Sequence, residues 1–416
     1  MSQPDNSARP LKVSIVGAGV GGLAAAVSLR RCGHHITIFE SSQIKNEIGA
    51  GLGIQPNALR ILQRFGYARE NLKPRDFDGV TSFNAKTGES STFPFAFSNP
   101  SQELRALNCH RSDLHDELKR LATGQGEGPP AQLHFDSKVV ACNPEAGTVT
   151  VSNGEVISAD LVLGADGIHS VVRTSILGQV IKASVTGWSC FRCLFDPATL
   201  SKFSELDWLT GGTSGPRNVI RRDDGSFLMF WIYAVRNGSL INFVGIHEDA
   251  YQDEREWVST ATKAEVLDKF QEFQPKFLRI LDLPTATPIL RWQLRAMPLL
   301  PTWIRGRAAL LGDAAHATLP LLGQGAAMAI EDAGTLGCLL PFGTKPDEVP
   351  SRLEAYQVLR KARGEFVNTE SVAQTKPEKR GGYIRSRELQ AQLIEHDAIK
   401  TAQEYFDMHF GGGIKG

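Results

Sequence analysis

The chain of 416 residues is longer than one ordinary hydrophobic core requires, so we expect two or three structural units. Its 45 basic residues balance 45 acidic ones without a long run of like charge, which argues against a nucleic-acid or polybasic membrane surface. The longest apolar runs are as short as strands, far below the ~20 residues that cross a bilayer. The N-terminus MSQPDNSARP has no apolar signal region, and we expect a cytoplasmic protein without a transmembrane segment.

The first motif is a glycine-rich turn between an expected strand, residues 13–16, and an expected helix. Gly17, Gly19 and Gly22 form the pattern G-x-G-x-x-G. The first glycine allows a tight turn, the second lets the backbone approach a pyrophosphate, and the third lets the helix pack close to the strand. The N-terminus of the helix then presents free N–H groups to phosphate. The pattern predicts a dinucleotide site; a turn without a ligand is the alternative.

An acidic residue ends the next expected strand, residues 36–39. Glu40 lies 21 residues after Gly19, where a carboxylate can accept hydrogen bonds from both hydroxyls of an adenosine ribose. An acid at this position disfavours a 2′-phosphate. The permanently held dinucleotide is therefore expected to be FAD or NAD and not NADP.

The chain continues with alternating elements. A helix with Leu59 and Phe65 on its apolar face is expected to follow a glycine loop that includes Gly51, and residues 76–98 predict a hairpin around Thr87-Gly88. The stretch NCHRSDLHDELKRLA predicts a helix, and Leu161–Leu163 predicts a buried strand that ends in another tight turn.

From about residue 181 to 298 strand-like stretches predominate. Two of them are joined at Asn237-Gly238, a dipeptide typical of hairpin turns, and one helix, about Lys263–Leu281, interrupts them. The stretch GRAALLGDAAHATLP then returns to strand, turn and helix. The tail after Pro350 is expected to be helical and to pack over the nucleotide-binding part or cap a pocket.

Six cysteines are scattered along the chain, and only Cys190 and Cys193 form a C-x-x-C. No second pair completes a zinc site, and at strand spacing the two side chains point to opposite faces. We expect reduced thiols and no metal.

Three separated stretches resemble the FAD-dependent aromatic hydroxylases, single-component flavoprotein monooxygenases with a fold like that of p-hydroxybenzoate and salicylate hydroxylases. The first stretch is the Gly17–Gly22 turn with Glu40, the second is DLVLGADGIHSVVR with Asp166, and the third is GRAALLGDAAHATLPLLGQGAAMAIEDA with Asp313. The resemblance covers roughly residues 11–340 and, weakly, the tail.

The resemblance implies an α/β fold with three parts. These are a discontinuous Rossmann-like FAD-binding domain (11–75, 100–180 and 299–345), an inserted mixed β-sheet substrate domain (76–99 and 181–298) and a C-terminal helical segment (346–416). NADPH or NADH would dock transiently, because the chain has no second G-x-G-x-x-G.

The implied cofactor-binding residues are Gly17, Gly19, Gly22, Glu40, Gly51, Arg111, Asp166, Asp313, Gly323, Gly325 and Ala326. Asp313 would accept a ribityl or ribose hydroxyl, with a helix cap as the alternative. Arg111 would reach the FAD phosphates or the ring edge, with a surface ion pair as the alternative. In the family, the motif of Asp166 serves both FAD and NADPH. His316 is expected to be structural.

The implied activity is hydroxylation of a small phenolic aromatic molecule with NAD(P)H and O₂ through a C4a-hydroperoxyflavin. Two candidate catalytic residues come from the inserted sheet: Arg192, in an otherwise apolar strand, and Tyr233, in a stretch that resembles the family's Tyr-Pro-x-Arg strand with Ala234 in place of proline. For both, a structural role is the alternative. An epoxidase, an oxidase or a halogenase on the same fold, and a non-catalytic scaffold, are the competing interpretations of function. The oligomeric state stays open.

Overall fold

The computed structural model describes residues 9–42, 50–95, 104–211, 215–221, 227–249, 257–376, 378–380 and 382–411. Its first sheet has the spatial order β19 (Ile304–Arg305), β20 (Ala308–Leu310), β12 (Leu161–Gly164), β1 (Lys12–Val16), β2 (His35–Phe39) and β8 (Gln132–His134). All neighbours are parallel except β19 and β20. The chain adds strands on one side of β1 up to β8 and then returns to its other side with β12. This switch point creates a crevice at the carboxyl ends of β1 and β12.

Helices cover the first sheet on both faces, and its central strands β1 and β12 are accordingly buried along almost their whole length. The helices of this part are α1 (Val20–Arg31), α2 (Pro56–Phe65), α3 (Arg111–Thr123), α4 (Val171–Leu177), α8 (Asp313–His316) and α9 (Gly325–Leu339). Helices α1 and α9 pack against each other along their length. Gly337 permits this approach, since a Cβ there would overlap the hydroxyl of Ser28.

The second sheet has eight strands: β17 (Val258–Thr260), β18 (Leu290–Ala296), β13 (Ser184–Phe195), β16 (Leu240–Glu248), β15 (Leu228–Val235), β14 (Arg217–Arg221), β5 (Gly79–Asn84) and β6 (Ser90–Pro94). Only β14 and β5 pair in parallel. The predicted hairpin is confirmed as β5 and β6. The predicted Asn237-Gly238 turn is also confirmed, with φ of 57° and 94° at these residues.

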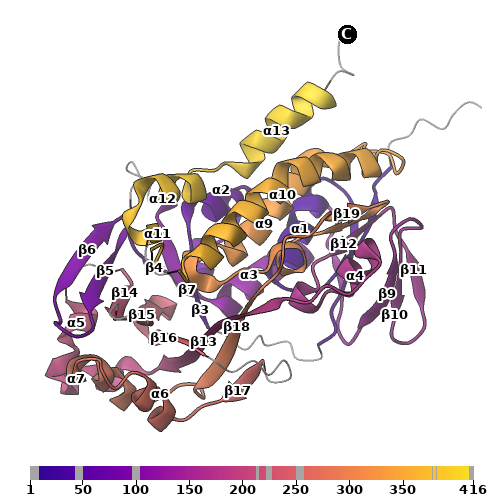
Figure 1. Cartoon of the computed structure of the whole chain (residues 1–416). Helices are drawn as coiled ribbons and strands as arrows, with labels where there is room; N and C mark the ends of the chain where they lie inside the picture. The colour runs from indigo at the N-terminus through magenta and orange to yellow at the C-terminus, as the bar shows by residue number, and fades with distance from the viewer. Residues whose placement is uncertain are drawn as a thin grey trace, which may run out of the picture.

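The two faces of the second sheet differ in what they cover. Phe191, Phe230 and Phe243 pack on one face into an aromatic core with the residues that follow β17. This core lies between the sheet and α6 (Lys263–Lys269) and α7 (Pro275–Leu278), which are at the lower side of Figure 1. The opposite face of the sheet contributes to the cavity described below.

The single helix predicted over Lys263–Leu281 is wrong. The structure has two short helices, α6 and α7, followed by a 3₁₀ turn at Arg279–Asp282. The break has a direct cause: Pro275 has no backbone N–H and begins the second helix, as proline favours the first helical turn.

Two small sheets and a short helix complete the body of the protein. One sheet joins β3 (Gly51–Ile54), β7 (Leu107–His110) and β4 (Arg75–Asp76), and the other joins β9 (Val139–Asn143), β10 (Thr148–Val151) and β11 (Val156–Ser158). The helix is α5 (Asp207–Thr210). No prediction covered β9, β10 and β11.

The tail is helical, as predicted, with α10 (Val349–Ala373), α11 (Gly382–Arg385), α12 (Arg387–Ile394) and α13 (Ala398–His409). These helices lie together on the side away from α6 and α7 (Figure 1), and α10 and α13 both contact α9. Tyr356 donates a hydrogen bond to the carbonyl of Leu310 at the end of β20. Among the described residues, none of the helices combines the length and apolar character that a membrane crossing requires.

Candidate active site

A cavity of ≈ 560 Å³ extends from the carboxyl ends of β1, β12 and β20 to the open face of the second sheet. Seven predicted cofactor residues line it: Gly19, Gly51, Arg111, Asp313, Gly323, Gly325 and Ala326. Both predicted catalytic residues, Arg192 and Tyr233, line it as well. The structure therefore brings together residues as far apart in the sequence as Gly19 and Ala326.

The glycine turn has the stereochemistry expected from its sequence. Gly17 has φ of +100°, and a Cβ there would overlap the carbonyl oxygen of Ala165 in the neighbouring turn. A Cβ at Gly22 would in turn overlap the carbonyl oxygen of Gly17, so the helix packs directly on the turn. At Gly19 a Cβ would meet nothing within 4 Å, because this backbone borders open space.

Several helix N-termini at this cavity have no side-chain cap, and two of them belong to the long helices α1 and α9. One is that of α1, at Gly19, and the other is that of α9, at Gln324. Their first N–H groups are available to an anion or to a polar ring edge. Gly323 has φ of +62°, and Gly325 borders open space as Gly19 does. A phosphate-bearing ligand with a flat ring system fits this backbone.

The Asp313 carboxylate faces the same cavity. It is exposed, and no described residue donates a hydrogen bond to it. Gly312, not Asp313, is the N-cap of α8, and α8 has no side-chain capping hydrogen bond. The helix-cap alternative is therefore wrong, and the carboxylate can accept a ligand hydroxyl.

Glu40 lies at the end of β2, outside the residues that line the cavity. Its Oε2 accepts a hydrogen bond from Ala18 N at 2.8 Å, and its Oε1 accepts one from Ser42 N at 2.8 Å. Burial acts to raise the pKa of Glu40, but these hydrogen bonds outweigh burial and lower it. The carboxylate is therefore ionised at neutral pH and holds the glycine turn. Its contact with an adenosine ribose stays a prediction.

Asp166 is used within its own turn. Its carboxylate accepts hydrogen bonds from the Ser170 hydroxyl at 2.5 Å and from Val171 N at 2.7 Å, and so helps the N-cap residue Ser170 to cap α4. Arg173 of the same motif donates hydrogen bonds to the carbonyls of Ile168 and Ala314 and so ties this turn to α8. The Asp166 side chain does not line the cavity. A direct contact of this carboxylate with FAD or NADPH stays a prediction, whereas its capping role is observed.

His316 is buried and structural, as expected. Its Nε2 lies 2.7 Å from Oδ2 of Asp332, which also accepts a hydrogen bond from Gly312 N. Arg360 of α10 donates a hydrogen bond to the other oxygen of Asp332 at 2.8 Å. This hydrogen-bond network holds the turn before Asp313 in place.

Arg192 lies on β13 and faces the cavity. Among the described residues no carboxylate lies within ion-pair distance, and its guanidinium carbon lies 5.8 Å from the centre of the Trp292 ring. Its Nε is buried without a hydrogen-bond partner. The structural ion pair that was the alternative for Arg192 is therefore not formed within the described part of the chain.

Tyr233 lies on β15, which is separated from the strand of Arg192 by β16. Burial raises the pKa of Tyr233 well above its usual range, although the positive charge of Arg192 acts to lower it. The phenol therefore stays protonated at neutral pH. Gly51 of β3 packs on this ring: a Cβ there would lie 2.6 Å from Cε2 of Tyr233 and 2.8 Å from Cβ of Asn242. Gly51 N also donates a hydrogen bond to Oδ1 of Asn242.

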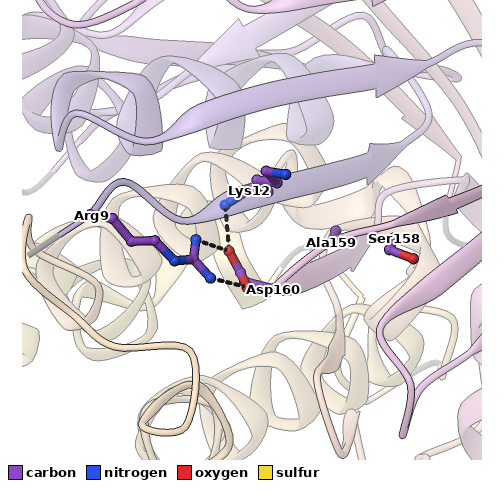
Figure 2. Close-up of a pocket in the computed structure, with 5 residues that line it drawn as sticks. All are labelled: Arg9, Lys12, Ser158, Ala159 and Asp160. Carbon is purple, nitrogen blue, oxygen red and sulfur yellow. Dashed lines mark hydrogen bonds and ion pairs between the residues drawn. The ribbon is translucent and has the colours of Figure 1, made fainter. Parts of the chain in front are cut away.

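A second hollow lies at the opposite ends of the same strands (Figure 2). Asp160, just before β12, accepts two hydrogen bonds from Arg9 and one from Lys12 N, each 2.8 Å long. These contacts satisfy the carboxylate. Ligands of parallel sheets bind at the carboxyl ends of the strands, whereas this hollow lies at the amino ends. We therefore assign the contacts of Asp160 a structural role, in which they hold the start of β1 in place.

Two cavity residues escaped the sequence analysis. Asn218 on β14 and Thr318 after α8 line the cavity with buried polar atoms that have no hydrogen-bond partner. The sequence gives no signal for Asn218, because it follows Arg217 in the short polar and apolar stretch RNVIR.

Comparisons with known proteins agree with this geometry. The sequence model described as FAD binding domain matches residues 10–371. The chain is 41% identical over 416 residues to hispidin-3-hydroxylase from Neonothopanus nambi, with 95% of each protein covered. It is 33% identical over 388 residues to the FAD-dependent monooxygenase cfoG from Aspergillus candidus, with 86% of this chain and 83% of the relative covered.

Among solved structures, a salicylate hydroxylase substrate complex superposes with a TM-score of 0.76 at 24% identity, covering 95% of this chain and 98% of that one. This likeness shows the shared fold. The glycine turn, the uncapped N-termini of α1 and α9 and the free Asp313 carboxylate fit an FAD cofactor. The chain therefore belongs to the FAD-dependent aromatic hydroxylases, flavoprotein monooxygenases that take electrons from NAD(P)H.

Proposed function

We propose that this monooxygenase hydroxylates a phenolic ring that is held against the second sheet, with Arg192 and Tyr233 on its hydroxyl group. The observation that carries the proposal is the unpaired Arg192 guanidinium in an apolar cavity wall. The relative hispidin-3-hydroxylase makes hispidin the first compound to test.

The two sides of the cavity have different proposed roles, one in binding FAD and the other in binding the substrate. We propose that segments 11–75, 100–180 and 299–345 hold FAD, and that 76–99 and 181–298 hold the substrate. Glycines 19, 323 and 325 would lie against the cofactor, while Arg111 and Asp313 would bind its polar groups. When bound and reduced, FAD would activate O₂, so that one oxygen atom of O₂ enters the substrate and the other leaves as water.

Arg192 would activate the substrate through its charge. A positive charge beside a phenol favours the phenolate, which is a stronger carbon nucleophile than the phenol. The guanidinium cannot accept the proton itself, because it has no free lone pair. The phenolic proton would therefore pass to bulk solvent as the substrate enters the cavity.

Tyr233 would orient the same oxygen. Its hydroxyl is protonated at neutral pH because burial raises its pKa, so it can donate a hydrogen bond to a phenolate. The surrounding wall is apolar, with Met229, Ile246 and Trp292 among its residues. Such a wall excludes water from the ring and strengthens the charge of Arg192.

The test is turnover with a defined product. The purified protein should contain FAD, and hispidin or another phenol should accelerate NADPH or NADH oxidation and gain one oxygen atom by mass spectrometry. Peroxide formation without a hydroxylated product for every phenol offered would contradict the proposal. Acceleration of NAD(P)H oxidation by non-phenolic rings alone would also contradict it.

A further inference from the structure

Asn218 is a buried amide that lacks a hydrogen-bond partner. It has 0% exposed surface, and neither Nδ2 nor Oδ1 is hydrogen-bonded. The residue nevertheless lines the cavity. Leaving such a group unpaired is unfavourable, whereas an apolar side chain of the same shape would not carry this cost. A bound ligand is the partner that would compensate it.

Asn218 and Arg192 lie at the two ends of one row across the second sheet. Arg192 of β13 is opposite Val244 of β16, Val244 is opposite Trp231 of β15, and Trp231 is opposite Asn218 of β14. Residues directly opposite each other point to the same face, and all four line the cavity. Three strand spacings of ~4.8 Å separate the ends of the row by roughly 14 Å.

We propose that the substrate is an elongated aromatic molecule with polar groups at both ends, one held by Arg192 and the other by Asn218. The inference rests on the proposed function and adds the class of substrate. A single benzene ring is far shorter than the row and would leave Asn218 unpaired. Two linked rings reach both ends while their apolar middle lies on Val244 and Trp231.

The side-chain amide of Asn218 determines which substrate group can bind at that end of the row. Asn218 offers two N–H donors and one carbonyl acceptor, so it recognises a hydroxyl or a carbonyl group, not a charged one. Because its amide is covered in the ligand-free structure, contact requires a rotation of Asn218 or of its half-buried neighbour Trp231. Rotamer changes of this kind are common on binding.

The first test compares ligands on the oxidised, FAD-containing enzyme by titration of the flavin absorption spectrum. The probes are 4,4′-dihydroxystilbene, 4-hydroxystilbene, which lacks the second hydroxyl, and 4-ethylphenol, which has one ring. We expect the dihydroxy compound to bind about ten-fold more tightly than 4-hydroxystilbene, and 4-ethylphenol to bind most weakly.

The second test removes the amide. Asn218→Leu keeps much of the shape and should weaken the binding of 4,4′-dihydroxystilbene about ten-fold, while the affinity for 4-hydroxystilbene is unchanged. Ser82→Ala is the matched control: Ser82 is opposite Asn218 on β5 but does not line the cavity, and the variant should bind both stilbenes as the wild type does.

Two results would overturn the inference. One is equal affinity of the wild-type enzyme for the two stilbenes, which decides the matter even if Asn218→Leu does not fold. The other is an equal loss of affinity for both stilbenes in Asn218→Leu, which would make the residue merely structural. Failure of the proposed function would be distinct, because the ligands would still be discriminated while no hydroxylated product formed.

Discussion

At the scale of single residues, the charge of Arg192 is the feature that most directly predicts chemistry. Replacement by methionine removes the charge and keeps much of the apolar stem. Hydroxylation by Arg192→Met should fall about a hundred-fold, because one close charge stabilises the developing phenolate by roughly 3 kcal/mol at the transition state. Rapid-mixing spectroscopy should show flavin reduction at the wild-type rate and loss only in the oxygen-transfer step.

The control for this variant is Arg305→Met, which removes an equal charge from an exposed ion pair with Glu145. This variant should hydroxylate normally, since surface ion pairs contribute little. If Arg192→Met hydroxylated at the wild-type rate, the arginine would be structural, and the activating group would lie elsewhere in the second sheet.

Glu40 and Asp313, the two carboxylates proposed to bind FAD, should differ in the effect of their removal. Asp313→Ala removes an exposed, unengaged group, so FAD affinity should fall roughly ten- to a hundred-fold while the melting temperature of the apoprotein stays unchanged. Glu40→Ala should weaken FAD binding and also lower that melting temperature, because Ala18 N and Ser42 N lose their acceptor. Flavin fluorescence and thermal denaturation measure both effects. Unchanged FAD dissociation constants in both variants would show that neither carboxylate binds the cofactor.

At the scale of elements, β3 supports β15 through a glycine. Gly51→Ala places a methyl group against the ring of Tyr233, so β3 or the ring must shift, at a cost of about 1–3 kcal/mol of stability. Gly53→Ala, two residues further along the same strand, is the control, since its nearest neighbour would lie 3.5 Å away. We expect hydroxylation to fall in the first variant only. Equal activity of the two variants would mean that the position of the Tyr233 ring does not matter.

Helix α10 is held by a buried charge network. Arg360 is 1% exposed and forms ion pairs with Glu331 and Asp332 of α9, both fully buried. Arg360→Met leaves these carboxylates undercompensated, so the free energy of unfolding should decrease by about 3–5 kcal/mol. Lys361→Met, which breaks only a surface pair with Glu365, should change it by less than about 1 kcal/mol. Urea denaturation of the two variants compares them; equal stabilities would reject this role.

At the scale of the whole molecule, local stereochemistry explains what could be predicted. The turn at Gly17 and the hairpin at Asn237-Gly238 depend on backbone conformations that few residues adopt, so their sequences were informative. The helix break at Pro275 also has a local cause, but the spacing of apolar residues on both sides of the proline predicted one continuous helix.

Tertiary contacts explain what could not be predicted. A carboxylate after a strand can face a cavity or bind the first N–H groups of the next helix; Asp313 lines the cavity, whereas Asp166 accepts a hydrogen bond from Val171 N at the start of α4. Nothing near either residue in the sequence distinguishes the two cases. The row from Arg192 to Asn218 depends on the register of four strands, and strand order is set by contacts between distant segments.

The acid sensitivity of the whole fold should depend on His396, between α12 and α13. Burial lowers the pKa of His396 from 6.5 to about 4, although the charge of Glu331 acts to raise it. Below pH ~6.5 His396 binds a proton in the unfolded chain, whereas in the folded chain it stays neutral until about pH 4. The free energy of unfolding therefore decreases as the pH falls across this window. His396→Gln should therefore lose fewer degrees of melting temperature than the wild type between pH 7.5 and pH 5, whereas His409→Gln, at an exposed position, should match the wild type. Parallel pH profiles of stability for His396→Gln and the wild type would show that this histidine is not buried in its neutral form.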